Sequence, residues 1–367
     1  MRIRLRSWEV SPLEVELLDP FVIATGTVTR TRNALVRVTI EAGDGRVAVG
    51  LGEAATLVPV TAEDLPDALA NLERIGAALG GIELDLRAGW DDLTTALDAA
   101  AAGAMVARAG AETALLDAVA RLHGVPLREM LGGALGAATT SMTTDITLPI
   151  RPVAKMVELA RAHRARGFTC FKVKVGRDAS HDFEALAAIA GAVPDAVFRI
   201  DANAGFAAAD AIALMDRLAR GGIAIECFEQ PCGADDLAGM AVVAAHVDPP
   251  VVADESVKHA ADVPRVAAAR AADGVNLKLA KSGGLLAALE IGRAARAAGL
   301  SLMCGGMVET RLGMSAAAHL VAALGGVDFV DLDTAWLLAG DPFAGGYAAE
   351  GPEYTLDTAP GLGVAPR

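Results

Sequence analysis

Three carboxylates stand at or near the ends of short β-rich runs in the second half of the chain. Asp201 lies in AVFRIDA (196–202), Glu229 ends IAIECFE (223–229) and Asp254 lies in PVVADE (250–255). One such acid would be typical of a helix cap, but three in register predict convergence at one end of a barrel. Because grouped acids repel one another without a cation and oxygen ligands suit Mg²⁺, we predict one Mg²⁺ per subunit, with Mn²⁺ as an alternative.

Lysines are expected at the same end. In TCFKVKV (169–175), side chains alternate, so Lys172 and Lys174 share one face and the apolar residues share the other. Lys278 lies in GVNLKLA (274–280), and Lys281 follows it. Charged lysine is rarely buried without a purpose, so these side chains are predicted to face the carboxylates.

This set of residues suits proton transfer at a carbon next to a carboxylate. A metal ion on that carboxylate stabilises the enediolate that forms. Nearby cations lower the pKa of a lysine, which then accepts the proton. Lys174 and Lys278, on opposite sides of the barrel, would permit removal from one face and return to the other, which is racemisation or epimerisation.

The elements that position these groups repeat along the chain. From about residue 139, eight β-rich runs alternate with Ala- and Leu-rich helical stretches, and markers from Lys174 to Asp331 recur every 24 to 28 residues. This predicts a parallel α/β barrel. The alternative, a doubly wound sheet, usually carries a Gly-rich phosphate loop, and neither GxGxxG nor a Walker pattern occurs. The predicted strands are 139–147, 169–175, 196–202, 223–229, 250–255, 274–280, 300–306 and 327–333.

The first third of the chain is predicted to be an α+β domain. We predict a strand over 2–18, a hairpin over 34–54 that turns at Asp44–Gly45, and helices over 62–79, 92–103 and 106–123. A Thr-rich loop over 24–32 lies before the hairpin. The predicted division is an N-terminal α+β capping domain (1–125), a barrel domain (126–335) and a tail (336–367) that packs back on the capping domain.

Composition excludes several classes of function. The net charge of −14 disfavours nucleic-acid binding, which depends on clustered Lys and Arg. The hydrophobic fraction of 53% is mostly Ala, in runs broken by charges, so membrane spans and a signal peptide are not predicted. The cytoplasm is the expected compartment. The four cysteines form no CxxC pair and are interpreted as free thiols in a reducing environment.

The ordered motifs KVKV, RIDAN, FEQP, ADES and NLKLAKSGG resemble the muconate-lactonising-enzyme subgroup of the enolase superfamily. GLGEA (50–54) and residues 111–133 are also similar to that family. The resemblance implies a modified TIM barrel of the (β/α)7β type. It implies that Lys174 and Lys278 are the acid/base pair, that Lys172 helps to hold the substrate carboxylate, and that the metal ligands are Asp201, Glu229 and Asp254.

The end of the last predicted strand separates the chemistries of this subgroup. VDLDT places Asp331 and Asp333 on one face and resembles the DxD that binds the substrate ammonium group in dipeptide epimerases. The segment FVIATGT (21–27) has Gly26 where epimerases of Ala-Glu carry an Arg. A dipeptide with another C-terminal residue, such as an apolar one, is therefore expected. Thr25, Gly26, Thr27 and Lys281 are further substrate-binding candidates.

The predicted activity is therefore a Mg²⁺-dependent dipeptide epimerase acting on a small-molecule substrate. The alternatives are a muconate-type cycloisomerase and an N-acylamino acid racemase or o-succinylbenzoate synthase. A non-catalytic small-molecule binder on the same barrel is a third, which the intact lysine pair disfavours. The resemblance also implies a homo-oligomer.

Overall fold

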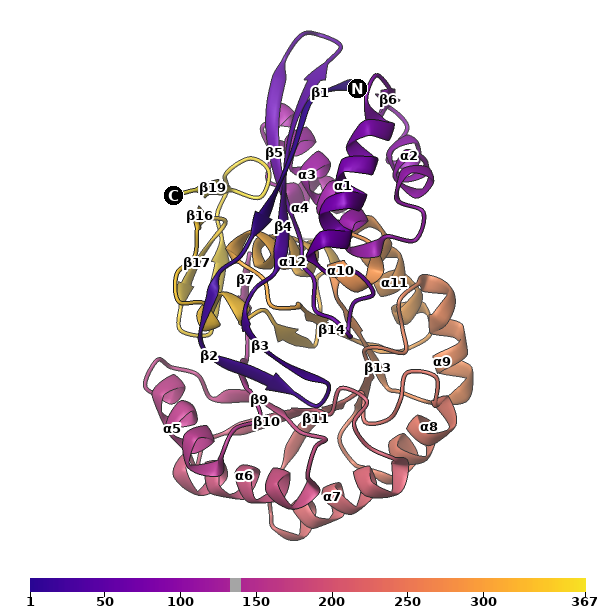
Figure 1. The fold of residues 1–367 in the computed structure, drawn as a ribbon. Helices are drawn as coiled ribbons and strands as arrows, with labels where there is room; N and C mark the ends of the chain where they lie inside the picture. The colour runs from indigo at the N-terminus through magenta and orange to yellow at the C-terminus, as the bar shows by residue number, and fades with distance from the viewer. Residues whose placement is uncertain (133–139) are drawn as a thin grey trace.

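The structure is a computed structural model, and it describes residues 1–132 and 140–367. An N-terminal antiparallel sheet with its helices lies beside an eight-stranded parallel barrel (Figure 1). Among the described residues, none of the helices combines the length and the apolar character that crossing a membrane needs.

The N-terminal sheet has the strand order β5-β4-β1-β6. Its strands are β1 (Arg2–Leu13), β4 (Asn33–Ala42), β5 (Val47–Ala54) and β6 (Glu83–Asp85). The hairpin predicted at Asp44–Gly45 is confirmed, since β4 and β5 pair on either side of this turn. The three predicted helices are also confirmed, as α1 (Leu65–Leu79), α2 (Asp91–Ala101) and α3 (Met105–His123).

A second hairpin leaves this sheet and crosses the open end of the barrel (Figure 1). It consists of β2 (Glu16–Ile23) and β3 (Gly26–Arg30), with only Ala24 and Thr25 in the turn. The predicted loop over 24–32 is therefore wrong for residues 26–30, and the predicted strand over 2–18 is two strands. β-branched residues on β3 favour the extended pairing, as in the Val22–Thr27 pair.

Eight parallel strands form the barrel in chain order. The ladder is open between the first and last strands, but the backbone N–H of Asp145 donates to Val330 O at 3.2 Å and brings these edges together. Cys227, Val252 and Met303, which lie on barrel strands, form a small buried apolar cluster. The strands are β8 (Ile146–Leu148), β9 (Cys170–Lys174), β10 (Val197–Asp201), β11 (Ile225–Glu229), β12 (Val251–Ala253), β13 (Gly274–Leu277), β14 (Ser301–Gly305) and β15 (Phe329–Asp331).

In the element order, α-helices follow each of the first seven barrel strands, and they lie on the outside of the barrel (Figure 1). The predicted (β/α)7β barrel with an N-terminal α+β capping domain is therefore confirmed. The helices are α5 (Val153–Arg164), α6 (Ala179–Ala192), α7 (Ala208–Arg220), α8 (Leu237–His246), η1 (Ala260–Asp262), α9 (Val263–Ala269), α10 (Leu279–Ser282), α11 (Leu285–Ala297) and α12 (Arg311–Leu324), and α4 (Leu127–Gly132) precedes the barrel.

The first predicted barrel strand, 139–147, is largely wrong. Residue 139 lies outside the described residues, and β7 (Ser141–Thr143) pairs with the C-terminal segment, not with the barrel. Side chains on β7 alternate between exposed and buried, which is typical of a sheet with one face in water. The barrel strand proper is β8, whose residues are all buried.

The C-terminal segment contacts both parts of the molecule. The backbone N–H of Leu362 donates to Asp117 on α3 at 2.7 Å, and Arg121 donates to Val364 O at 2.9 Å. The division at residues 125 and 335 stays a prediction. The elements of this segment are η2 (Thr334–Leu337), β16 (Phe343–Gly345), β17 (Tyr347–Glu350), β18 (Glu353–Leu356) and β19 (Val364–Pro366).

Candidate active site

Five charged side chains meet at the carboxyl ends of neighbouring barrel strands. Lys174 pairs in register with Asp201 on the next strand, and Asp201 pairs with Glu229 on the strand after that. Asp254 follows β12 directly, and Lys278 follows β13. All five are buried, so the barrel brings distant parts of the chain into one desolvated group.

Lysine ammonium groups link the three predicted metal ligands. Lys172 Nζ lies 2.6 Å from Glu229 Oε2 and 3.2 Å from Asp201 Oδ2. Lys278 Nζ lies 2.6 Å from Asp254 Oδ2 and 3.6 Å from Glu229 Oε1. Glu229 is therefore the central acid, and it shares one cation with the carboxylate on each side.

The donor set fits a hard divalent cation. The three acids present only oxygen atoms, which are the donors that Mg²⁺ prefers, and they stand at the ends of three adjacent strands. Two neighbouring buried oxygens, Asn203 Oδ1 and Glu255 Oε2, have no hydrogen-bond partner among the residues that the structure describes. In this structure the ammonium groups of Lys172 and Lys278 lie between the three acids. Among the described residues, only Asp145, Asp331 and Asp333 bring three acid oxygens within 4.8 Å of one another. A cation shared by Asp201, Glu229 and Asp254 would therefore have to displace these lysine contacts.

The two predicted bases differ in their contacts. Lys174 Nζ donates to Asp201 Oδ2 at 2.6 Å and lies 5.9 Å from the centre of the Phe21 ring. Burial lowers the pKa of Lys278, but the charges of Asp254 and Glu229 outweigh burial and raise it. The sequence instead predicts a lowered pKa for the lysine bases, because cations are expected nearby. A bound divalent ion would act in that direction by Coulomb repulsion.

Lys281 does not line the cavity that holds the other lysines. Its ammonium group donates to Asp254 O at 2.6 Å, to Asp254 Oδ1 at 2.7 Å and to Asn276 O at 2.7 Å. All three donors of this side chain are therefore used within the protein. In this structure Lys281 positions Asp254, although the sequence argument placed it among the substrate-binding candidates.

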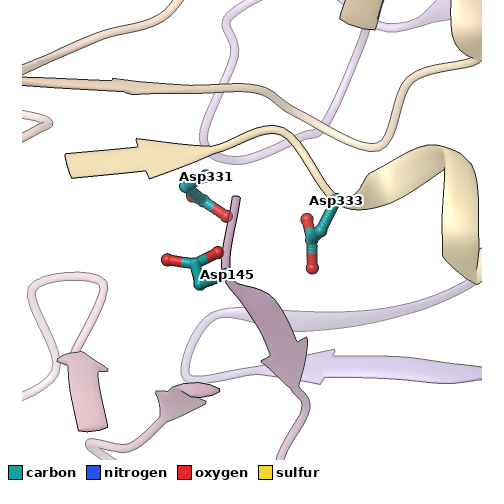
Figure 2. A group of neighbouring side chains, drawn as sticks. All are labelled: Asp145, Asp331 and Asp333. Atoms are coloured by element: carbon teal, nitrogen blue, oxygen red, sulfur yellow. The ribbon is translucent and has the colours of Figure 1, made fainter. Parts of the chain in front are cut away.

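A second acidic group lies on the opposite side of Lys172. Asp331, Asp333 and Asp145 offer oxygens within 4.8 Å of one another, and all three are buried (Figure 2). Asp331 Oδ2 lies 2.6 Å from Lys172 Nζ, and Asp333 Oδ2 accepts from the backbone N–H of Thr147. Burial, followed by repulsion from Asp331, raises the pKa of Asp333 to about 7.

Asp145 is the member of this group that the sequence argument missed. Arg199 donates to its Oδ2 at 2.9 Å, while its buried Oδ1 has no hydrogen-bond partner in the described part of the chain. Burial and repulsion from Asp331 hold its pKa well above the usual range. The available signal is an acid directly before the short segment ITL of β8, whose three residues are buried, and no motif or spacing marks it.

The hairpin over the barrel contributes an apolar wall. Phe21 and Ile23 of β2 line the cavity that contains the lysines and the acids Asp331 and Asp333, together with Leu57, Val60 and Met307. The predicted candidates Thr25, Gly26 and Thr27 do not line this cavity, because they lie at the tip of the hairpin. Arg177 holds that tip by donating to Ala24 O at 3.2 Å and Gly26 O at 3.1 Å.

The cavity therefore has a charged floor, an acidic side and an apolar roof. The floor can bind a carboxylate through cations and move a proton, the acidic side can bind an ammonium group, and the roof can cover an aliphatic or aromatic side chain. A small zwitterion with an apolar group would match these three surfaces, but the open space between them is about 20 Å³ in this structure, so its binding requires the walls to move apart.

Two family models cover most of the chain. Residues 8–132 match the mandelate racemase / muconate lactonizing enzyme N-terminal domain, and residues 155–367 match the enolase C-terminal domain-like family.

Curated relatives match over nearly the whole chain. The L-Ala-D/L-amino acid epimerase of Populus trichocarpa is 39% identical over 96% of this chain and 82% of its own length. The aromatic dipeptide epimerase of Herpetosiphon aurantiacus is 38% identical over 99% of both. A solved structure from Enterococcus faecalis V583, a dipeptide epimerase complexed with Mg and L-Leu-L-Tyr, has a TM-score of 0.89 and 32% identity over all of both chains.

Proposed function

Because this chain belongs to the mandelate racemase / muconate lactonizing enzyme family of the enolase superfamily, we propose that it is a Mg²⁺-dependent dipeptide epimerase. The observation that carries this proposal is the shared cavity, in which Lys174 and Lys278 lie with Asp331 and Asp333. The relatives support it, since they are epimerases of dipeptides and one of them is complexed with Mg and a dipeptide.

In this proposal the floor of the cavity binds the C-terminal carboxylate of the dipeptide. Asp201, Glu229 and Asp254 hold Mg²⁺, and Lys172 adds its ammonium charge beside them. The bound ion supplies positive charge at the carboxylate when the α-carbon loses its proton. This assignment follows from the oxygen donor set and from the cations that already link these acids.

The proton is transferred by the two lysines. Lys174 removes the α-proton of the C-terminal residue from one face and Lys278 returns a proton to the other face, and the roles exchange in the reverse direction. Each lysine must be neutral to accept the proton. The apolar roof excludes water during the transfer, and each lysine ammonium group exchanges its protons with solvent between turnovers.

The acidic side selects a free N-terminus. Asp331 and Asp333 bind the ammonium group of the dipeptide, and the buried Asp333 Oδ1 has no partner within the described residues. An additional carboxylate, as in muconate, would be repelled by these acids. The acidic side therefore favours an epimerase over the cycloisomerase and the acylamino acid racemase.

The C-terminal side chain is apolar in this proposal. It lies under Phe21 and Ile23, which cover the cavity from the hairpin. Gly26, at the position where epimerases of Ala-Glu carry an Arg, supplies no charge for a Glu side chain, and the space around its Cα is open. A cytoplasmic homo-oligomer completes the proposal, and light scattering of the purified protein tests the assembly.

Isotope exchange tests the reaction. In heavy water with Mg²⁺, L-Ala-L-Leu should take up deuterium at the Leu α-carbon and yield L-Ala-D-Leu, and a chelator should stop both. Lys278→Gln should reduce the rate by about 10²- to 10⁴-fold, the usual range for loss of a general base. Lys258→Gln, on an exposed loop, is the control. Absence of deuterium uptake with every dipeptide tried would reject epimerase activity.

A further inference from the structure

A second cavity adjoins the candidate active site. It lies between β2, α5 and η2, and it shares two wall residues, Phe21 and Thr147, with the first cavity. Its other walls include Leu18 of β2, Leu159 of α5 and Trp336 of η2. The two cavities are therefore neighbours that meet at Phe21 and Thr147.

The shared residue Thr147 also touches the acidic side of the active site. Its backbone N–H donates to Asp333 Oδ2. An ammonium group held at Asp331 and Asp333 thus places the first α-carbon of a dipeptide close to the boundary between the cavities. The first cavity is taken by the C-terminal residue, so the side chain of the N-terminal residue has the second cavity available.

We propose that the second cavity binds the side chain of the N-terminal residue, and that it selects a large apolar side chain. This inference rests on the proposed function, because it needs a dipeptide whose ammonium group is held by Asp333. It adds a specificity site at the position away from the reacting carbon.

The walls of the second cavity favour an apolar occupant. Leu18 is 59% exposed, a large apolar side chain that a bound ligand would cover. Trp336 is fixed as a wall by an edge-on contact with Phe168, with ring centroids 5.8 Å apart. Two charged residues also line the wall, namely Arg166 and Asp19, and the carboxylate of Asp19 lies 3.8 Å from Lys155 Nζ. Arg166 could therefore attract an acidic side chain, and this is the competing occupant that the substrate series below tests.

One polar atom in the wall lacks a partner. His163 is only 7% exposed, and its Nδ1 makes no hydrogen bond within the described residues. Burial lowers the pKa of His163 to about 4, so the ring is neutral near pH 7. A neutral ring nitrogen can meet the hydroxyl of a tyrosine, and it does not attract an acidic side chain.

A substrate series tests the selection. We measure deuterium exchange with L-Xaa-L-Ala, in which Xaa is Gly, Ala, Leu, Phe, Tyr, Glu or Lys. The ratio kcat/KM for Leu, Phe or Tyr should exceed that for Gly at least tenfold. A preference for Glu would assign the cavity to Arg166 and overturn the proposal, as would equal values across the series.

A filled cavity provides the matched test. Ala162 is exposed on α5 and lines the cavity, whereas Ala154 is exposed on the same helix and does not. Ala162→Phe should lower kcat/KM for L-Phe-L-Ala at least tenfold and leave that for Gly-L-Ala within twofold. Ala154→Phe should change neither. Equal losses for both substrates in Ala162→Phe would contradict the proposal.

A second variant removes a wall. Trp336→Ala should reduce the advantage of Phe over Gly, while Trp90→Ala, at another half-buried tryptophan, should preserve it. Exchange without any dependence on Xaa rejects only the second cavity as a specificity site. No exchange with any dipeptide rejects the proposed function and this inference together.

Discussion

At the scale of single residues, Asp333 connects the structure to the chemistry most directly. One carboxylate oxygen accepts from the backbone N–H of Thr147, and the other is buried without a partner in residues 1–132 and 140–367. Burial and the neighbouring Asp331 raise its pKa to about 7. A substrate ammonium group would satisfy the free oxygen and favour the ionised form.

Asp333→Asn should weaken recognition of the free N-terminus. A buried hydrogen bond to a charged group contributes about 1.5–3 kcal/mol, so kcat/KM for a dipeptide should fall roughly 10- to 150-fold, mainly through KM. Activity on the N-acetylated dipeptide, which has no ammonium group, should change little. Asp328→Asn, at an exposed acid that also accepts a backbone N–H, is the control. Equal losses on both substrates would assign Asp333 a structural role.

The residue scale also shows what sequence alone can predict. Lys174, Asp201 and Glu229 were selected because each stands at the end of an alternating strand, and the barrel places such positions in one mouth. Asp145 has no such position, since it precedes a strand whose start was misplaced. Lys281 is a substrate-binding candidate in the sequence because it lies close to Lys278. Its contacts with Asp254 depend on the turn after β13, which the sequence pattern does not predict.

At the scale of elements, the packing of β5 on α3 fixes the N-terminal sheet against its longest helix. Gly52 of β5 lies directly over the backbone of α3, and a Cβ added to it would clash with Gly110 O. Gly50 faces Ala114 and Ala118 in the same way. The small residues of GLGEA (50–54) therefore permit a close approach of strand and helix.

Gly52→Ala should destabilise the protein by about 1–3 kcal/mol, the usual cost of overpacking, because the clash is with backbone that cannot rotate away. Chemical denaturation measures the change. Gly43→Ala is the control, since a Cβ there has its nearest neighbour at 4.0 Å. A variant as stable as the wild type would mean that α3 can shift without loss.

Regular spacing explains why most elements were predictable. A strand, a helix and two loops need a nearly constant length, so the barrel follows from the repeat. The hairpin β2–β3 was not predicted because Gly26 is typical of a turn and β3 has a single apolar residue, Val28, to mark an alternation. The hairpin also contacts the barrel, where the backbone N–H of Ile150 donates to Val22 O at 2.9 Å, and no local pattern predicts such a contact.

At the scale of the whole molecule, buried polar contacts join the N-terminal sheet to the barrel. Glu53 of β5 accepts from the backbone N–H groups of Thr310 and Gly313, at the start of α12. Asn33 of β4 donates to Val308 O at 2.9 Å. Glu309 lies beside them, fully buried. These residues are separated by over 200 positions in the chain, and neither periodicity nor a motif predicts such pairs.

This junction should make stability depend on pH. Burial, and then repulsion from Glu53, raises the pKa of Glu309 to about 8, from an ordinary value of 4.5. The folded protein therefore binds more protons than the unfolded chain between these values. Stability from this group is complete below about pH 4.5 and is lost as the pH rises toward 8, with a slope of at most about 1.4 kcal/mol per pH unit.

Glu309→Gln removes this titration and keeps an oxygen that can accept from Met307 N. Free energies of unfolding from denaturant titrations at pH 6, 7 and 8 should fall less steeply for the variant than for the wild type. The free energy of unfolding of the variant, relative to that of the wild type, should therefore increase as the pH rises. Glu290→Gln, at an exposed glutamate of α11, should keep the wild-type slope. Parallel curves for Glu309→Gln and the wild type would show that Glu309 does not hold a proton in the folded state. The junction would then contain two buried negative charges, on Glu53 and Glu309.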